Sequence, residues 1–312
     1  MSTTSDDVMA EALARGTVVL DGGLSNALEE RGHDLSSDLW TARLLRDDPA
    51  QIVAVHRAYF DAGARVATTA SYQASVPGLV ATGLSRAEAE RLIASSVRLA
   101  REARDAALAL TDGPLLVAAS VGPYGAALAD GSEYTGRYGL TAAQLRDFHL
   151  PRLELLAEAG PDLLAVETIP DADEAEVLVP LLDEIGLPAW FSYSVAEGPT
   201  RAGQPLASAY DVLRGSTTIR AAGVNCSAPR EVPAAVRTAV AVTGLPGVAY
   251  PNRGEAWDST SHSWTGSGTF DPREVRAWIA AGAQLVGGCC RVGPDDIAAI
   301  AAVAQSSGTS YG

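Results

Sequence analysis

The sequence alternates short apolar runs, rich in β-branched residues, with longer Ala- and Leu-rich segments whose apolar residues recur at helical spacing. This alternation is typical of parallel βα units, because two parallel neighbouring strands need a crossover connection, usually a helix. Eight strands are predicted, at residues 17–22, 65–70, 115–122, 162–169, 189–195, 219–226, 247–252 and 284–290. The helices predicted between them include 51–62, 86–110, 142–159, 172–185, 232–242 and 272–281.

Eight βα units are the number found in a closed (β/α)8 barrel. An open, doubly wound sheet often carries a Gly-x-Gly-x-x-Gly turn after a strand, and no predicted strand is followed by one. No internal linker divides the chain. We therefore predict an α/β fold, a TIM-type (β/α)8 barrel that forms a single domain over 1–312, with loose tails at about 1–10 and 305–312.

Net charge, the length of the apolar runs, the N-terminal segment and the cysteine count limit the partners and the compartment that we expect. Net charge is −15, with 23 Lys and Arg against 38 Asp and Glu, which argues against nucleic acid. Apolar runs such as 115–121 and 297–304 are much shorter than the roughly 20 residues that cross a bilayer. The N-terminus lacks the basic and apolar regions of a secretory signal, and three cysteines give no disulfide framework. We predict a cytoplasmic protein with no nucleic-acid or membrane partner.

All three cysteines lie at predicted strand ends: Cys226 ends the sixth strand, and Cys289 and Cys290 end the eighth. In a (β/α)8 barrel these ends open onto a common mouth. Three thiolates suit zinc, which prefers four ligands, so a fourth position would be open to water or substrate. Because adjacent residues of a regular strand face opposite sides, the paired cysteines can share an ion only where the strand is irregular, which Gly287 and Gly288 would permit. Buried apolar thiols or a redox pair are the alternatives.

Two carboxylates, Asp21 and Glu167, also lie near predicted strand ends, in the apolar contexts VVLDGG and LLAVETIP. A buried carboxylate is costly unless it is paired, so a ligand ammonium or a cation is a suitable partner. The alternative is that each accepts hydrogen bonds from backbone N–H groups of a nearby loop.

Two glycine-rich loops, 122–139 and 253–268, are candidate lids over the mouth, or else ordinary surface loops. The second loop also holds His262. Aromatic side chains in the first loop would shelter a cation. The aromatic residues are Tyr124, Tyr134 and Tyr138 in the first loop and Trp257 and Trp264 in the second.

Seven stretches carry a family resemblance from end to end of the chain. They are VVLDGG at 18–23, TTASYQAS at 68–75, SVGPYGAALADGSEYTGRY at 120–138, ETIPDADEAE at 167–176, GVNCSAP at 223–229, YPNRGEAWD at 250–258 and GGCCRVGP at 287–294. With these motifs the chain resembles the homocysteine S-methyltransferases, and most closely the short, single-domain branch that uses S-methylmethionine or a related sulfonium as methyl donor.

The resemblance implies a zinc ion held by Cys226, Cys289 and Cys290, with the homocysteine thiol as fourth ligand. It implies that Asp21 and Glu167 hold the amino group of homocysteine. Asn225 and Ser71, which lie in the matching stretches, are predicted as further substrate-binding residues. Three positions depart from the family pattern without removing a metal ligand: Asn26 and Ala27, where a Thr-Glu pair is usual, and Asp296, where a His is common.

The implied reaction gives methionine from homocysteine. A free thiol has a pKa near 8.5, so zinc would be needed to hold it as thiolate at neutral pH, and the negative cluster would attract a cationic donor. A sulfonium leaves as a neutral thioether, so no general acid is required. S-methylmethionine or S-adenosylmethionine would serve as donor. The alternatives are a metal-independent lyase or aldolase with Glu167 as base, a methyltransferase acting on selenocysteine or another thiol, and a binding protein with structural zinc.

Overall fold

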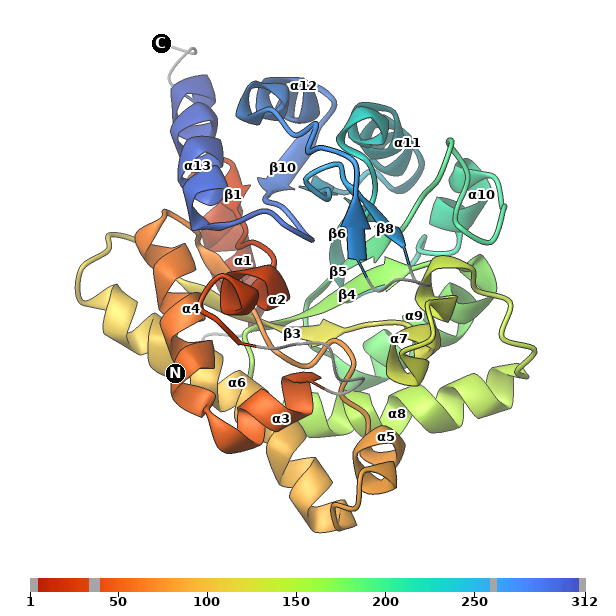
Figure 1. Ribbon diagram of the computed structural model, residues 1–312. Coiled ribbons are helices and arrows are strands. Elements are labelled where there is room, and N and C mark those ends of the chain that lie inside the picture. The colour runs from red at the N-terminus through yellow and green to blue at the C-terminus, as the bar shows by residue number, and fades with distance from the viewer. Residues whose placement is uncertain (1–4, 34–39, 259–262, 309–312) are drawn as a thin grey trace.

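In the computed structural model, which describes residues 5–33, 40–258 and 263–308, eight parallel strands form one closed sheet surrounded by helices (Figure 1). The barrel strands are β1 (Val18–Val19), β2 (Val66–Thr68), β3 (Leu116–Val121), β4 (Leu163–Ile169), β5 (Ala189–Tyr193), β6 (Ile219–Asn225), β7 (Gly247–Tyr250) and β10 (Ala283–Val286). Their order is β1-β10-β7-β6-β5-β4-β3-β2, and a parallel bridge between Leu20 and Val66 joins β1 to β2. The predicted (β/α)8 barrel is therefore confirmed.

The helices of the described residues pack mainly around the outside of the barrel (Figure 1). They are α1 (Ser5–Ala14), α2 (Leu24–Glu29), α3 (Trp40–Asp47), α4 (Pro49–Asp61), α5 (Val76–Ala81), α6 (Arg86–Leu108), α7 (Tyr124–Leu128), α8 (Ala142–Glu158), α9 (Ala172–Ile185), α10 (Leu206–Asp211), α11 (Val232–Thr243), α12 (Val275–Ala280) and α13 (Pro294–Gly308). Short 3-10 turns are η1 (Ser132–Tyr134), η2 (Pro229–Glu231) and η3 (Pro272–Glu274), and a hairpin joins β8 (Ala256–Asp258) to β9 (Ser263–Thr265).

Local sequence explains where several helices begin and end. Ser85 and Glu88 form a reciprocal capping box at the start of α6, and Thr141 and Gln144 form another at the start of α8. Left-handed Gly186 ends α9, where a side chain would be strained. In the described part of the chain, no helix has both the length and the apolar character needed to span a membrane.

The core has two layers. Alternate strand residues such as Leu116, Leu163 and Trp190 fill the barrel interior, and the opposite faces pack against the outer helices. Met9 and Ala12 of α1 belong to the interior cluster, so this helix packs against the barrel interior.

The structure corrects the predicted loose tails. Residues 5–10 belong to α1, and residues 305–308 belong to the last turn of α13. The amphipathic pattern around Met9 and Ala12 is short, which is why the N-terminal segment was not predicted as a helix. The rest of the predicted tails, residues 1–4 and 309–312, lies outside the described residues.

Candidate metal centre and substrate site

The three cysteine thiols meet at the mouth of the barrel. The Sγ atom of Cys226 lies 2.8 Å from that of Cys289 and 3.7 Å from that of Cys290, and the last two are 3.9 Å apart. Among the described residues, this is the one group of Cys, His, Asp and Glu side chains compact enough to hold a metal ion. The predicted convergence of the sixth and eighth strands is confirmed.

This donor set fits a zinc ion. Two thiolates on tetrahedral zinc, with Zn–S bonds of about 2.3 Å, lie roughly 3.8 Å apart, and two of the three separations have this value to within a few tenths of an ångström. Hydrogen bonds from Cys226 and Cys289 lower the pKa of Cys290 well below its usual range, whereas the bond to Cys226 raises that of Cys289. Three adjacent thiolates repel one another, and a bound cation would offset that repulsion.

Cys226 is positioned by an unusual backbone conformation directly after β6. Its φ is +48°, in the left-handed region, and its N–H donates to the carbonyl of Tyr250 at 3.2 Å. A non-glycine residue is uncommon in this region and such residues cluster at functional sites. The turn at Cys226 aims its thiol across the mouth toward the end of β10.

Cys289 and Cys290 lie in a turn beyond β10, which ends at Val286 and not at 290 as predicted. The loss of regularity that the paired thiols need is confirmed, but the glycines serve a different purpose from the one predicted. Neither Gly287 nor Gly288 has a positive φ. A Cβ on Gly287 would lie 2.7 Å from that of Leu20, and one on Gly288 would lie 2.3 Å from Cγ1 of Val292, so both allow close packing.

Asn26 supports the cysteine turn from β1's side of the mouth. Its side-chain oxygen accepts from the N–H of Arg291 at 2.5 Å, and Arg291 has a φ of +65°. Asp296 accepts from the N–H of Gly293 at 3.1 Å, where α13 begins. Two of the departures from the family pattern are therefore residues that hold the turn after Cys290, while Ala27 is buried in the core.

Asp21 is buried at the end of β1 and is held by three donors. The N–H and hydroxyl of Thr68 donate to it at 2.6 and 2.9 Å, and the hydroxyl of Tyr250 donates at 2.9 Å. Burial nevertheless raises the pKa of Asp21 to about 7. The backbone donor predicted as one alternative is present, although it belongs to strand β2 and not to a loop.

Glu167 lies opposite, in β4, and contacts the same network. Its carboxylate accepts from the hydroxyl of Ser120 and from the side-chain amide of Asn225 at 3.3 Å. Burial raises the pKa of Glu167 to about 8, opposed by the Ser120 bond and assisted by the charges of Cys226 and Asp21. The two carboxyl groups and the thiols thus lie within electrostatic range of one another.

Asn225 connects Glu167 to an irregularity in β4. Its Oδ1 accepts from the N–H of Thr168 at 2.5 Å, and its Nδ2 donates to the Thr168 hydroxyl at 2.7 Å. Thr168 has a φ of +61°, and the pairing register between β4 and β5 shifts between Val166 and Ile169. A β-branched residue in this region is strained, so Asn225 stabilises the bulge that sets the direction of Glu167.

Ser71 is fully buried behind this network. Its hydroxyl donates to the carbonyl of Ser120 at 2.7 Å, and its Oγ lies 2.7 Å from the hydroxyl oxygen of Thr69. Arg152 of α8, which sequence reasoning missed, donates to the carbonyls of Ser71, Tyr72 and Gly122. Ser71 and Arg152 hold the segments that follow β2 and β3.

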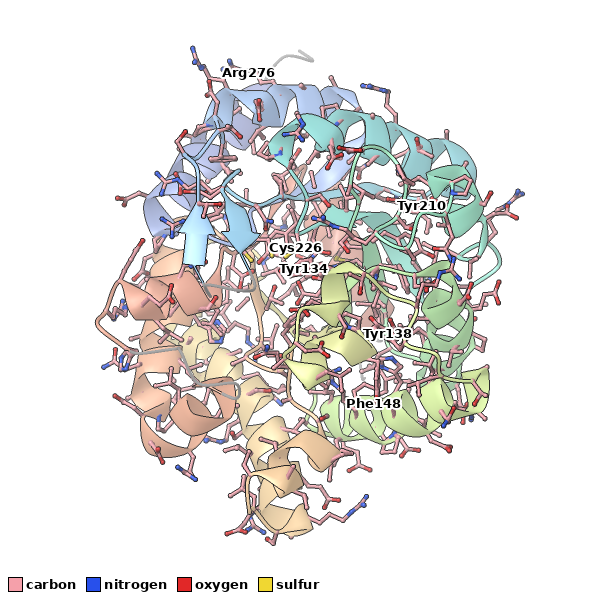
Figure 2. All side chains as sticks on the ribbon, turned by 45° about the vertical axis from the view of Figure 1, so that its right-hand side comes forward. Tyr134, Tyr138, Phe148, Tyr210, Cys226 and Arg276 are labelled. Carbon is pink, nitrogen blue, oxygen red and sulfur yellow. The ribbon has the colours of Figure 1, made fainter. Side chains whose placement is uncertain are left out.

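The 122–139 loop covers one side of the mouth, and its aromatic residues divide into two groups. Tyr138 packs against Tyr124, and the Tyr124 ring lies 4.9 Å from the ring of Phe148 in α8, which anchors the loop to that helix. Tyr134 instead lies beside Cys226 (Figure 2), and burial followed by the charges of Cys226 and Cys290 raises its pKa well above the usual range. Of the three tyrosines predicted to shelter a cation, Tyr134 is therefore the one that lies beside the thiols.

Within the described residues of the 253–268 loop, β8 and β9 pair antiparallel, with Trp257 opposite Trp264 in the register. Its base is tied to the cysteine turn, because the N–H of Arg253 donates to the carbonyl of Cys290 and the Arg291 guanidinium donates to Glu255 at 3.1 Å. His262 lies outside the described residues.

Known proteins resemble this chain over almost its whole length. Residues 18–304 match the family described as homocysteine S-methyltransferase. The homocysteine S-methyltransferase YbgG of Bacillus subtilis is 43% identical over 302 residues, covering 94% of this chain and 96% of that protein. The homocysteine S-methyltransferase of Escherichia coli is 45% identical over 292 residues, covering 91% and 94%.

A comparison with solved structures points to the same family. The metallated form of the homocysteine methyltransferase MmuM from Escherichia coli superimposes with a TM-score of 0.84 at 44% identity, covering 92% of this chain and 96% of that one. The shared fold, the full-length coverage and the motifs that form the mouth lead to one conclusion: the chain belongs to the homocysteine S-methyltransferase family and is a methyltransferase.

Proposed function

We propose that this protein transfers a methyl group from a sulfonium donor to the thiolate of L-homocysteine, with zinc bound by Cys226, Cys289 and Cys290. The observation that carries the proposal is the meeting of three thiols with two buried carboxyl groups at one barrel mouth. When bound, zinc would supply the positive charge that keeps the substrate thiol deprotonated at neutral pH.

Asp21 and Glu167 would bind the ammonium of homocysteine. Burial raises the pKa of Asp21 to about 7 and that of Glu167 to about 8, which disfavours their ionised forms in the absence of a counterion. An arriving ammonium favours the ionised forms and offsets the cost of burial. Asn225 would keep Glu167 in place through its bond to the carboxylate.

The methyl step needs no proton transfer. The bond between the donor sulfur and its methyl carbon breaks, and the electron pair stays on the donor sulfur, which becomes a neutral thioether. A lone pair of the homocysteine thiolate forms the new bond, giving methionine. The protein contributes by holding the thiolate and the methyl in line at short distance and by excluding water. S-methylmethionine is the proposed donor, with S-adenosylmethionine as the second choice.

The test is methionine formation by zinc-loaded protein given homocysteine and labelled S-methylmethionine, with S-adenosylmethionine and selenocysteine as further donor and acceptor arms. Cys226→Ser should abolish both activity and bound zinc, whereas Thr238→Ser, at a half-buried position on the outer helix α11, should change neither. Full methionine formation by metal-stripped protein would contradict the zinc role. No methionine formation from either donor by zinc-loaded protein would favour the lyase or aldolase alternative with Glu167 as base.

A further inference from the structure

Glu133 and Arg201 carry opposite charges near the barrel mouth, and neither belongs to the proposed homocysteine site. Oε2 of Glu133, in η1, and Nε of Arg201, in the loop between β5 and α10, are buried, and neither has a hydrogen-bond partner among the described residues. A buried charged atom without a partner costs free energy, which a ligand of the opposite charge would offset. Glu133 and Arg201 are therefore candidate ligand contacts.

Tyr134 links these two residues to the thiols. It follows Glu133 in the chain, and the Arg201 guanidinium carbon lies 5.5 Å from the centre of its ring. The charge of Cys226 contributes to the raised pKa of Glu133, after burial, and also to that of Tyr134. Figure 2 places Tyr134 next to Cys226. Glu133, Tyr134 and Arg201 thus form one patch beside the metal centre, hereafter the Tyr134 patch.

The Tyr134 patch is held rigidly by Asp171, at the start of α9. The carboxylate of Asp171 accepts from the N–H of Arg137 at 3.1 Å and from the side chain of Gln204 at 2.6 Å. A Cβ on Gly136 would lie 3.3 Å from that of Ala202, so the two loops are in close contact there. Both loops are fixed to one buried carboxylate, which keeps Glu133 and Arg201 in a set relation.

We propose that the Tyr134 patch binds the amino-acid end of the methyl donor, with Glu133 contacting its α-ammonium and Arg201 its α-carboxylate. This inference rests on the proposed function and assigns the class of donor as an α-amino acid sulfonium. The sulfonium would then lie by the Tyr134 ring, between the patch and the thiols.

The charges of such a donor match the patch. An α-amino acid sulfonium carries an ammonium, a carboxylate and a sulfonium, and the patch offers a carboxylate, a guanidinium and an aromatic ring. Arg favours bidentate binding of a carboxylate, and an aromatic face stabilises a cation. Asp21 and Glu167 remain free for the ammonium of homocysteine, so the two amino acids occupy separate sites.

The experiment measures donor binding without turnover. Isothermal titration calorimetry of zinc-loaded protein with S-methylmethionine, in the absence of homocysteine, is compared for wild type, Glu133→Gln and Arg201→Gln. A parallel series uses S-adenosylmethionine, which has the same amino-acid end. Each variant should bind the α-amino acid sulfonium at least about tenfold more weakly, equivalent to about 1.4 kcal/mol. In separate steady-state assays of methyl transfer, the KM for homocysteine should change less than about twofold.

A donor that lacks the amino-acid end separates this inference from a general charge effect. Methyl transfer from trimethylsulfonium should be little changed in both variants. Glu197→Gln, which removes an exposed carboxylate from the same β5–α10 loop, is the matched control and should behave as wild type.

Unchanged affinity for S-methylmethionine in both variants would overturn the inference, and so would an equal loss for trimethylsulfonium. A wild-type protein that binds S-methylmethionine through Glu133 and Arg201 but forms no methionine would instead overturn the proposed function. Equal bound zinc and equal melting temperature in all variants verify that folding and the metal centre are intact.

Discussion

Asp21 and Glu167 are the two residues whose ionisation the site controls most strongly. Each is buried and hydrogen-bonded by neutral donors, and burial still raises the pKa of both. In the proposed function the ammonium of homocysteine is their counterion, because a nearby positive charge stabilises the ionised form of a buried carboxyl group. Homocysteine affinity should therefore increase as pH rises through about 7 to 8, until the substrate ammonium itself loses its proton.

The pKa of Glu167 predicts a pH dependence of stability. Its folded-state pKa of about 8 lies above the ordinary 4.5, so the folded protein keeps a proton that the unfolded chain releases between those values. The free energy of unfolding of ligand-free protein should fall over that window, by on the order of 1–3 kcal/mol from this group. Glu167→Gln should flatten the dependence. Urea titrations at pH 6 and pH 8 measure the change in the free energy of unfolding. The same change with pH in wild type and Glu167→Gln would contradict the assignment to Glu167.

Asn26 should affect the metal centre although it does not touch the metal. Its bond to the N–H of Arg291 holds the cysteine turn, so Asn26→Ala should weaken zinc affinity by about 10-fold, as for other residues that position ligands. Competition with a chromophoric chelator gives the affinity. Glu29→Ala removes the other partner of Asn26 and should leave zinc binding unchanged. Zinc affinity equal to that of wild type in Asn26→Ala would show that the cysteine turn keeps its conformation without this hydrogen bond.

The sequence predicted residues whose side-chain chemistry marks them better than residues whose role comes from a long-range hydrogen bond. The thiols of Cys226, Cys289 and Cys290 meet, and Asp21 and Glu167 are buried within electrostatic range of each other, because strand-end position and side-chain type together define these residues. Asn26 was noticed only as a departure from the family pattern. Its role depends on a loop 265 residues away, and no local pattern reports such a contact.

At the scale of elements, the mouth is built from strand ends that stop being regular. β4 contains the register shift beside Thr168, β6 turns sharply at Cys226, and β10 ends before Gly287. Helical and strand periodicity predicted all eight barrel strands and the approximate ranges of helices such as α6, α8 and α9, because these elements bury continuous faces. The helices α1, α10 and α13 and the end of β10 were not predicted, since contacts between elements determine them.

Gly288 should be intolerant of a side chain. A Cβ there would lie 2.3 Å from Val292, inside the turn that holds both cysteines, so Gly288→Ala should reduce stability by about 1–3 kcal/mol and lower zinc content. Gly293→Ala is the matched control, because its nearest neighbour would be at 3.9 Å. Thermal unfolding and metal analysis compare the two variants. Equal behaviour would mean that the turn adjusts without loss of the ligands.

At the scale of the whole molecule, α1 contributes to the interior of the barrel. Met9 is 2% exposed and packs with residues from several strands. Met9→Ala should lower the free energy of unfolding by about 2–4 kcal/mol and leave zinc affinity and KM unchanged, since the mouth is elsewhere. Glu11→Ala, in an exposed ion pair with Arg15, should cost less than about 1 kcal/mol. Denaturant unfolding measures both, and equal small losses would exclude a packing role for α1.

The closure of the barrel between β1 and β10 has a consequence during translation. β1 pairs with a strand near the opposite end of the chain, and two of the three thiols follow that strand. A polypeptide still emerging from the ribosome therefore carries an unpaired sheet edge and a lone Cys226 until nearly all of it has been made. Capture of the proposed zinc ion by all three thiols would therefore follow synthesis of the segment beyond β10.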